Sequence, residues 1–391
     1  MLNSVWDLAV PLVASPLHCP LRETELNAAL RSWAKLNPEG GVLALVPAAE
    51  QAQVGLLQQV CRQLRLPLAG AVFPALVTEA GECRDGVMLV RLAQMPPVRL
   101  FTAMDLPEAA DQVVTQVAAW LDALPPGGAE PVLFSIFDAC LGNLYSLLRQ
   151  LGRGLDDRVV YAGANAGQET FQPLDCVFDG DILAGNALLT VLLPSASRPS
   201  VEHGFSLPVR IMRATRTEAN RILTLDDRPA FEVYREALVE DYGQELSADS
   251  FYGHSVHFPL AILAGDSLVQ VRIPVVLDAA GGLICVGEVP EGSIIVVIKA
   301  PEVGESDCID RIADHLGVSQ GTLLTFYCAG RRLHLGPDGT RHELADLCRQ
   351  TGSTHLAGAL SLGEISTDGR GAPAFHNAAM LCLRVRDQDQ S

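Results

Sequence analysis

Several sequence patterns that mark common enzyme classes are absent from this chain. Its 391 residues contain no Walker phosphate loop, no Gly-x-Gly-x-x-Gly and no His-Glu-x-x-His. The chain therefore lacks the usual signatures of nucleotide-binding proteins and zinc proteases. The ten cysteines include no Cys-x-x-Cys pair, which argues against a zinc knuckle, a thioredoxin-type pair and an iron–sulfur cluster. We therefore do not expect an enzyme, and we expect most cysteines to be buried free thiols.

Positive charge and long apolar runs are also scarce. Lysine and arginine number 28 against 46 acidic residues, so the formal net charge is −18. A chain this acidic repels nucleic-acid phosphates and anionic membranes, and neither is expected as a partner. No apolar run is long enough to cross a bilayer, and residues 1–7 lack the basic start of a secretory signal. We therefore expect a cytoplasmic protein.

What the sequence does contain is a regular alternation of strand and helix patterns. Short apolar runs at 41–46 and 68–72 predict buried strands, and the spacing of apolar residues over 51–64 and 106–124 predicts helices. Strand patterns dominate after residue 240, for example at 269–273, where apolar and polar residues alternate.

These patterns predict an α/β protein with two mixed α/β domains, in which helices flank the sheets. The length of the chain suits two domains, each large enough for its own core. We predict an N-terminal extension over 1–37, an N-terminal domain over 38–240 and a C-terminal domain over 241–391.

A set of short motifs in a fixed order carries more information than any one pattern. The C-terminal part contains Phe-Tyr-Cys-Ala-Gly-Arg-Arg at 326–332, Gly-Glu-Ile at 363–365 and Phe-His-Asn at 375–377. The N-terminal part contains Gly-Ala-Asn-Ala-Gly at 163–167 and Phe-Asp-Gly-Asp at 178–181. Together these motifs resemble the FIST family, whose bacterial members are sensory ligand-binding modules. The resemblance covers nearly all of the chain beyond residue 38 and implies a sensor.

One departure from the family pattern concerns residues 70–77. Where the family often carries Gly-Cys followed by small hydroxyl residues and Gly-Glu, this chain has Gly-Ala-Val-Phe-Pro-Ala-Leu-Val. If this loop lines the pocket, Phe73 and Pro74 favour a flat apolar ligand. That character is similar to a subset of FIST proteins that bind haem and sense nitric oxide. The resemblance then implies a b-type haem, and as partner a histidine kinase or a cyclic-di-GMP enzyme that the sensor regulates.

A haem sensor needs an axial ligand, and neutral imidazole is a common one. Our first choice for the metal ligand is His257, because Val256 and Phe258 flank it; His203 and His254 are further cofactor-binding candidates. Because Pro259 disfavours helix at the residue before it, we predict that 251–259 is extended, so that His254 and His257 face opposite sides.

Arginine is the natural partner of the haem propionates. If Arg331 and Arg332 continue a strand, they point to opposite faces, so at most one of them can reach the propionates. We name Arg331 as the cofactor-binding candidate.

Two alternatives remain open at this stage. The first is a FIST sensor for a small metabolite such as an amino acid, in which Glu364 binds an amine and His376-Asn377 supplies hydrogen bonds in the pocket. The second is a thiol enzyme that uses Cys328, activated by Arg331 nearby.

Overall fold

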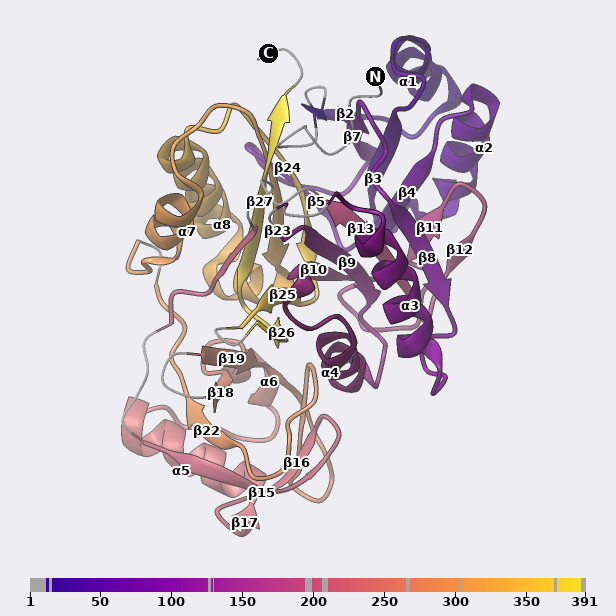
Figure 1. Cartoon of the computed structure of the whole chain (residues 1–391). Coiled ribbons are helices and arrows are strands. Elements are labelled where there is room, and N and C mark those ends of the chain that lie inside the picture. Colours follow the sequence, from indigo (N-terminus) through magenta and orange to yellow (C-terminus); the bar gives the residue numbers. More distant parts are fainter. Residues whose placement is uncertain are drawn as a thin grey trace.

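The computed structural model describes residues 12–13, 16–125, 128, 130–193, 199–205, 210–264, 268–302, 304–368 and 371–387. These residues form a large body and a smaller lobe below it (Figure 1). The lobe uses one stretch of chain, from about residue 212 to about residue 297, and the body uses the segments on either side. No helix among the described residues is long and apolar enough to span a membrane. The prediction that the chain has no secretory signal concerns residues 1–7, and these lie outside the described residues.

The body contains two sheets. The larger one takes 13 of the described strands from both ends of the chain. Its strands are β1 (Leu12–Val13), β2 (Leu17–Cys19), β3 (Gly41–Pro47), β4 (Leu68–Phe73), β5 (Leu76–Thr78), β6 (Gly81–Cys83), β7 (Val87–Leu92), β11 (Val177–Asp179), β12 (Leu183–Ala184), β14 (Pro199–Glu202), β23 (Thr322–Cys328), β24 (His355–Ser361) and β27 (Met380–Asp387).

The second sheet has six described strands in the order β26-β25-β10-β9-β13-β8. They are β8 (Val98–Thr102), β9 (Val132–Asp138), β10 (Val160–Ala166), β13 (Ala187–Leu193), β25 (Glu364–Thr367) and β26 (Pro373–His376). Along β9, Phe134 and Ile136 enter the core shared with the larger sheet, whereas Leu133 and Phe137 enter a core on the other face. Because both faces of β9 are buried, five of its seven residues are apolar.

Helices cover the outer faces of the body. Helices α1 and α2 pack on the strands β3, β4 and β7, α3 and α4 pack on the six-stranded sheet, and α7 and α8 pack on β23 and β24 (Figure 1). Their bounds are α1 (Glu23–Leu36), α2 (Val54–Leu64), α3 (Ala109–Asp122), α4 (Leu144–Leu155), α7 (Cys308–Leu316) and α8 (Ala329–Thr351), with short 3-10 helices at η1 (Ala48–Gln53) and η2 (Asp156–Arg158). The chain bends within α8 at Gly336, whose φ of 71° is not helical.

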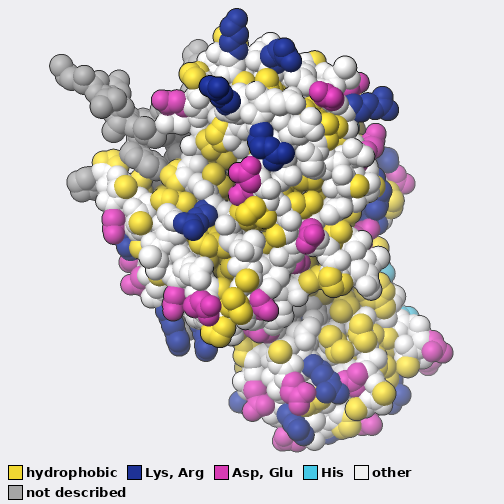
Figure 2. Space-filling model, turned by 90° about the vertical axis from the view of Figure 1, so that its right-hand side faces the viewer, with side chains coloured by type: hydrophobic (Ala, Val, Ile, Leu, Met, Phe, Trp, Pro, Cys, Tyr) yellow, Lys and Arg dark blue, Asp and Glu magenta, His cyan; other side chains and the backbone are white. Residues whose placement is uncertain are grey.

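The lobe is a third sheet with two helices packed against it. Its described strands are β15 (Met212–Glu218), β16 (Arg221–Leu225), β17 (Arg228–Pro229), β18 (Leu260–Ala264), β19 (Leu268–Arg272), β20 (Pro274–Leu277), β21 (Leu283–Cys285) and β22 (Ile294–Val297), and its helices are α5 (Ala230–Tyr242) and α6 (Phe251–Ser255). Because the chain enters the lobe after β14 and leaves it before α7, two connections join the lobe to the body. Figure 2 shows the lobe as a smaller projection, with apolar side chains gathered on the visible face near the waist.

The predicted fold class is confirmed: the protein is a mixed α/β protein in which helices flank sheets. Two local predictions are wrong. Residues 251–255 form helix α6, because the residue that Pro259 restricts is Phe258, which lies beyond the helix. Arg331 does not continue a strand, because β23 ends at Cys328 and α8 begins at the next residue.

Candidate ligand-binding site

A cavity with a volume of about 220 Å³ lies where the lobe meets the body, and we call it the junction cavity. It is lined by Glu169, Phe171, Tyr252, Val256, Ile273, Val275, Val286, Cys328, Ala329, Gly330, Arg332, Leu333, Leu362 and Asn377. The body contributes the ends of its strands and the start of α8, and the lobe contributes α6, β20 and the residue after β21.

The topology of the body explains this position. Strands β23 and β24 are parallel, as are β9 and β10. Cys328 ends β23, Leu362 follows β24, and Glu169 follows β10, so the floor of the junction cavity is built at the carboxyl ends of parallel strands. Ligands of open α/β sheets bind at such ends, because the loops that leave the strands there diverge and leave a crevice.

Gly330 allows the lobe to close over this floor. A Cβ atom at position 330 would lie 2.4 Å from Cδ1 of Ile273 on the lobe, which is closer than two carbon atoms can approach. The absence of a side chain therefore brings the lobe against the start of α8. Arg272, which is buried in the lobe, donates a hydrogen bond of 2.9 Å to the carbonyl oxygen of Phe375 in the body and fixes the contact.

Most of the lining is apolar, and two buried polar atoms within it, Oδ1 of Asn377 and Nε of Arg332, form no hydrogen bond with any described residue. The side chain of Asn377 is 1% exposed, and its Oδ1 accepts no hydrogen bond from any described residue. Leaving a buried carbonyl oxygen unpaired costs roughly 1–3 kcal/mol. An N–H or O–H donor on a bound molecule would remove that cost, so Asn377 is the clearest hydrogen-bonding group for a ligand in the junction cavity.

Among the lining residues that the structure describes, Arg332 is the only cationic one, and two carboxylates lie against it. Its Nη2 contacts Glu169, which also lines the cavity, and its Nε lies 3.4 Å from Glu82 on β6. Arg84 joins the same network through Glu169, at 3.3 Å. The side chain of Arg332 is 14% exposed, and the carboxylates hold its position. A carboxylate on a ligand would meet a fixed positive charge there.

Under the floor lies a second carboxyl group, that of Glu364. It is fully buried; it accepts a hydrogen bond of 2.5 Å from the hydroxyl of Ser361 and one from the backbone N–H of Ala379. Burial raises the pKa of Glu364 to about 8, because the charged form loses hydration that these two donors only partly replace. Glu364 is therefore protonated at neutral pH and does not offer an ammonium ion the negative charge that the sequence interpretation assigned to it.

Cys328 is a thiol in this environment. It is 2% exposed, and its Sγ accepts a hydrogen bond of 3.0 Å from the backbone N–H of Ala378. Burial raises the pKa of Cys328 far above its ordinary value, with the nearby Glu364 as a further cause. The activated thiolate that a cysteine nucleophile needs does not form at such a site.

Arg331 turns away from the junction cavity into the body. Its side chain is 2% exposed and forms an ion pair with Glu343, with an Nη2–Oε1 distance of 2.6 Å and an Nε–Oε2 distance of 2.8 Å. Its Nη1 donates to the carbonyl oxygen of His203 at 2.7 Å, and the hydroxyl of Tyr327 donates to Glu343 at 2.6 Å. With its donors occupied, Arg331 joins α8 to the segment after β14.

None of the histidines named from the sequence lines the junction cavity. In His257, Nδ1 lies 2.6 Å from Nδ1 of His334, and in His254, Nδ1 lies 3.0 Å from the carbonyl oxygen of Ser250. In His203, Nδ1 accepts the backbone N–H of Phe205 at 2.9 Å. Burial, with the nearby charges of Arg331 and Arg311, lowers the pKa of His203 to about 4, so this imidazole is neutral.

Phe73 and Pro74 also lie elsewhere. Phe73 is fully buried in the core between the two sheets of the body, where its ring centroid is 5.6 Å from that of Phe326. Pro74 follows it and is buried too. The apolar segment at 70–77, which ends β4 and begins β5, therefore belongs to the core and does not line the junction cavity.

The residues of the junction cavity do not fit a haem group. A volume of about 220 Å³ falls below the roughly 300 Å³ at which pockets for drug-sized ligands begin, and haem is at least that large. The described lining includes no imidazole to ligate iron, and its thiol is protonated.

Sequence reasoning found part of this site and missed the rest. It gave roles to Cys328 and Asn377 but chose Arg331 and not Arg332. It gave no role to Tyr252 and Val256, which share one side of a helical turn because they are four residues apart. The prediction that 251–259 is extended concealed that spacing.

Sequence reasoning also missed a Gly-x-Ser-x-Gly pattern at 317–321, which in some hydrolases carries the nucleophilic serine. That serine lies between α7 and β23, a helix-to-strand turn, whereas a nucleophile elbow is a strand-to-helix turn.

Comparison with known proteins gives one clear result. No curated protein matches the chain. Two family models do: that of the FIST N domain over residues 42–228 and that of the FIST C domain over residues 230–367. The FIST C range contains Tyr252, Val275 and Arg332, and the FIST N range contains Glu169, so both parts contribute to the junction cavity. Since these two ranges cover most of the sequence, the chain belongs to the FIST family of signal-transduction sensor domains.

Proposed function

We propose that this protein is a sensor for a small metabolite that binds in the junction cavity. The observation that carries the proposal is the unpartnered Oδ1 of Asn377 in an otherwise largely apolar cavity between two parts of the molecule. The ligand should combine a compact apolar portion with an N–H donor for Asn377 and a carboxylate for Arg332. An amino acid with an apolar side chain has all three features.

A ligand at this position would act on the contact between lobe and body. Two chain connections join the lobe to the body. Because the ligand would contact both the lobe and the body, its binding should favour the closed arrangement over an open one. We infer that a partner protein detects the difference by direct contact. A histidine kinase or a cyclic-di-GMP enzyme is the class of partner that we propose.

The haem-based hypothesis remains a separate proposal. In it, His257 ligates the iron of a b-type haem and nitric oxide is the signal. One observation is compatible with it: if Nε2 of His334 donates to the carbonyl oxygen of Pro301 at 2.8 Å, then Nδ1 of His257 is the donor to His334, and Nε2 of His257 keeps its lone pair. Because the junction cavity does not fit a porphyrin, this haem would need another site.

Thermal unfolding with a panel of ligands tests the proposal. We expect one or more apolar amino acids to raise the unfolding temperature of the wild type, because a ligand that binds only the folded state stabilises it. Val275→Trp fills the cavity and should remove this effect. Val276→Trp is the matched control, since Val276 is the next residue of β20, is 49% exposed and does not line the cavity.

Hemin belongs in the same panel. If hemin gives a Soret band that shifts with nitric oxide and disappears in His257→Ala, while no amino acid stabilises the wild type, the metabolite proposal is wrong and the haem proposal stands. If an amino acid stabilises the wild type and the Val276→Trp control but not Val275→Trp, the junction cavity is the sensor site.

A further inference from the structure

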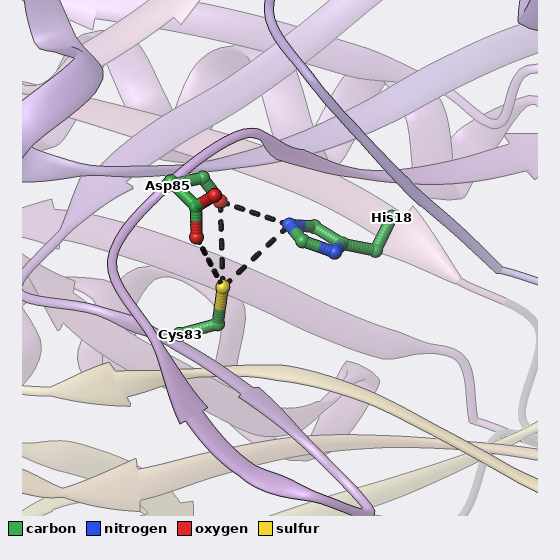
Figure 3. A group of neighbouring side chains, drawn as sticks. All are labelled: His18, Cys83 and Asp85. Carbon is green, nitrogen blue, oxygen red and sulfur yellow. Dashed lines mark hydrogen bonds between the residues drawn. The ribbon is translucent and has the colours of Figure 1, made fainter.

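A second group of chemically reactive side chains lies at the edge of the larger sheet of the body. His18 on β2, Cys83 at the end of β6 and Asp85 in the turn before β7 converge, as Figure 3 shows. Each offers one ligand atom, and the three atoms lie within 4.8 Å of one another. None of the three lines the junction cavity, and His18 precedes the range that matches the FIST N domain.

Hydrogen bonds already hold these side chains together. The thiol of Cys83 donates to Oδ1 of Asp85 at 2.8 Å, and Nε2 of His18 lies 2.8 Å from the carbonyl oxygen of Asp85. These hydrogen bonds keep the donor atoms of the three residues close together.

The spacing suits a tetrahedral ion. Zinc–nitrogen bonds of about 2.0 Å and zinc–sulfur bonds of about 2.3 Å place the two donor atoms about 3.5 Å apart. Sγ of Cys83 and Nε2 of His18 are 3.7 Å apart. The carboxylate oxygen of Asp85 must move away from the sulfur by less than 1 Å to reach the same spacing, roughly from 2.8 Å to 3.5 Å, and Asp85 is exposed and free to do so.

The backbone makes room for the imidazole. Gly86 has a φ of +74°, and a Cβ atom there would lie 2.8 Å from Nε2 of His18 and 2.6 Å from the carbonyl oxygen of Cys19. Any other residue at position 86 would push β2 and the turn apart. The absence of a side chain at position 86 therefore lets His18 lie against Cys83 and Asp85.

We propose that His18, Cys83 and Asp85 form a binding site for a divalent transition-metal ion of the zinc class. Thiolate and imidazole are the ligands that such ions prefer over magnesium or calcium, and the carboxylate completes a set of three. The thiolate and the carboxylate together balance the two positive charges, and the thiol proton is released to solvent. Three protein ligands leave a fourth position open for water or an exchangeable ligand.

The site has a route to the junction cavity. Glu82 and Cys83 are neighbours in β6, so their side chains point to opposite faces of the strand. Glu82 contacts Arg332 of the cavity at 3.4 Å, and Arg84, on the other side of Cys83, contacts Glu169 at 3.3 Å. An ion that fixes Cys83 and Asp85 therefore also fixes the turn that holds the charged side of the cavity.

Titration with Co²⁺, a spectroscopic substitute for Zn²⁺, tests the proposal. The full chain, freed of any affinity tag and of metal by a chelator, should bind one equivalent with an absorption band from thiolate to cobalt, and Zn²⁺ should displace it. Cys83→Ser should abolish the band, and His18→Gln should weaken binding at least tenfold. Cys140→Ser is the matched control, because Cys140 is an exposed thiol outside the cluster.

Two results would overturn this site. One is a wild-type protein without a thiolate band at one equivalent of Co²⁺. The other is a Cys83→Ser variant whose band matches that of the wild type while Cys140→Ser loses it. Gly86→Ala gives an independent check that leaves all three ligands in place: binding should weaken, while far-ultraviolet circular dichroism shows that the variant is folded.

Discussion

Two adjacent arginines at the start of α8 occupy opposite situations. Arg331 lies in the anchor cluster, which we define as Arg331, Glu343 and Tyr327, where each charged or polar group has buried partners. Arg332 lies at the junction cavity, where Asn377 has an oxygen without a partner. The motif at 326–332 thus contains two neighbouring arginines with different roles. The residue with complete partners holds the fold, and the residues with incomplete partners are available to a ligand.

Removing Arg331 should have the largest effect on stability. Arg331→Ala leaves the carboxylate of Glu343 buried without its cation, and breaking a buried ion pair from one side costs about 3–5 kcal/mol of unfolding free energy. Urea denaturation followed by circular dichroism measures the loss. The double variant Arg331→Met/Glu343→Leu should recover much of it, because no charge is left unpaired. A loss below about 1 kcal/mol in the single variant would show that the anchor cluster is not structural.

The buried carboxyl of Glu364 should make stability fall with rising pH. Its pKa is about 8 in the folded protein and near 4.5 in the unfolded chain, so the folded state holds a proton that the unfolded chain releases. The contribution is complete below pH 4.5 and is lost as the pH rises through 8. Between pH 6.5 and 8 we expect a loss of up to about 2 kcal/mol in the wild type and a flat profile in Glu364→Gln.

The pH range for this measurement begins at 6.5 so that the titration of His203 does not contribute to it. Its pKa is about 4 in the folded protein, below the ordinary 6.5, so the stability that it contributes is present above pH 6.5 and is lost as the pH falls toward 4. Glu364 and His203 therefore oppose each other only in the acid range. If Glu364→Gln keeps the slope of the wild type between pH 6.5 and 8, another group is responsible for it.

Replacing Asn377 should separate binding from folding. Asn377→Leu removes the unpartnered Oδ1 and the cost of burying it, so the unfolding free energy should not fall and should rise by up to about 1–3 kcal/mol. Affinity for the ligand found by thermal unfolding should fall roughly tenfold, which corresponds to one lost hydrogen bond of about 1.4 kcal/mol. Isothermal titration calorimetry measures the affinity. Unchanged affinity would mean that the ligand does not bond to Asn377.

Arg332→Ala should have the smallest effect on folding. Its ion pairs with Glu82 and Glu169 involve carboxylates that are about 30% exposed, so the unfolding free energy should fall by less than about 1 kcal/mol. Compared with Arg331→Ala under identical conditions, this variant gives the sharpest test of the difference between the two arginines. Equal losses in the two variants would contradict that difference.

Periodic patterns in the sequence were enough to predict the fold class. The helix expected at 106–124 is α3, Ala109–Asp122, and the strand expected at 41–46 is β3, Gly41–Pro47. The pairing of β1 and β27, at opposite ends of the chain, could not be predicted, because no local pattern records which distant strand is the neighbour.

Sequence reasoning drew attention to residues of the candidate site only where they lie in local motifs. Cys328, Arg332 and Asn377 lie in short motifs that could be read from the sequence, whereas Val275 and Val286 are ordinary apolar residues that acquire a role only when the lobe packs on the body. The histidines were chosen for their chemistry, yet burial and partners decide what an imidazole does. Whether one of them binds haem stays a prediction.

Hydrogen exchange with the strongest stabilising ligand tests the central claim most directly, because it locates binding without assuming a site. We expect ligand-dependent protection in peptides that contain 252–256 on the lobe and 328–333 on the body, and no such protection in Val275→Trp. Protection confined to peptides around 69–77 or around His203, with these two segments unchanged, would contradict a sensor site at the junction of lobe and body.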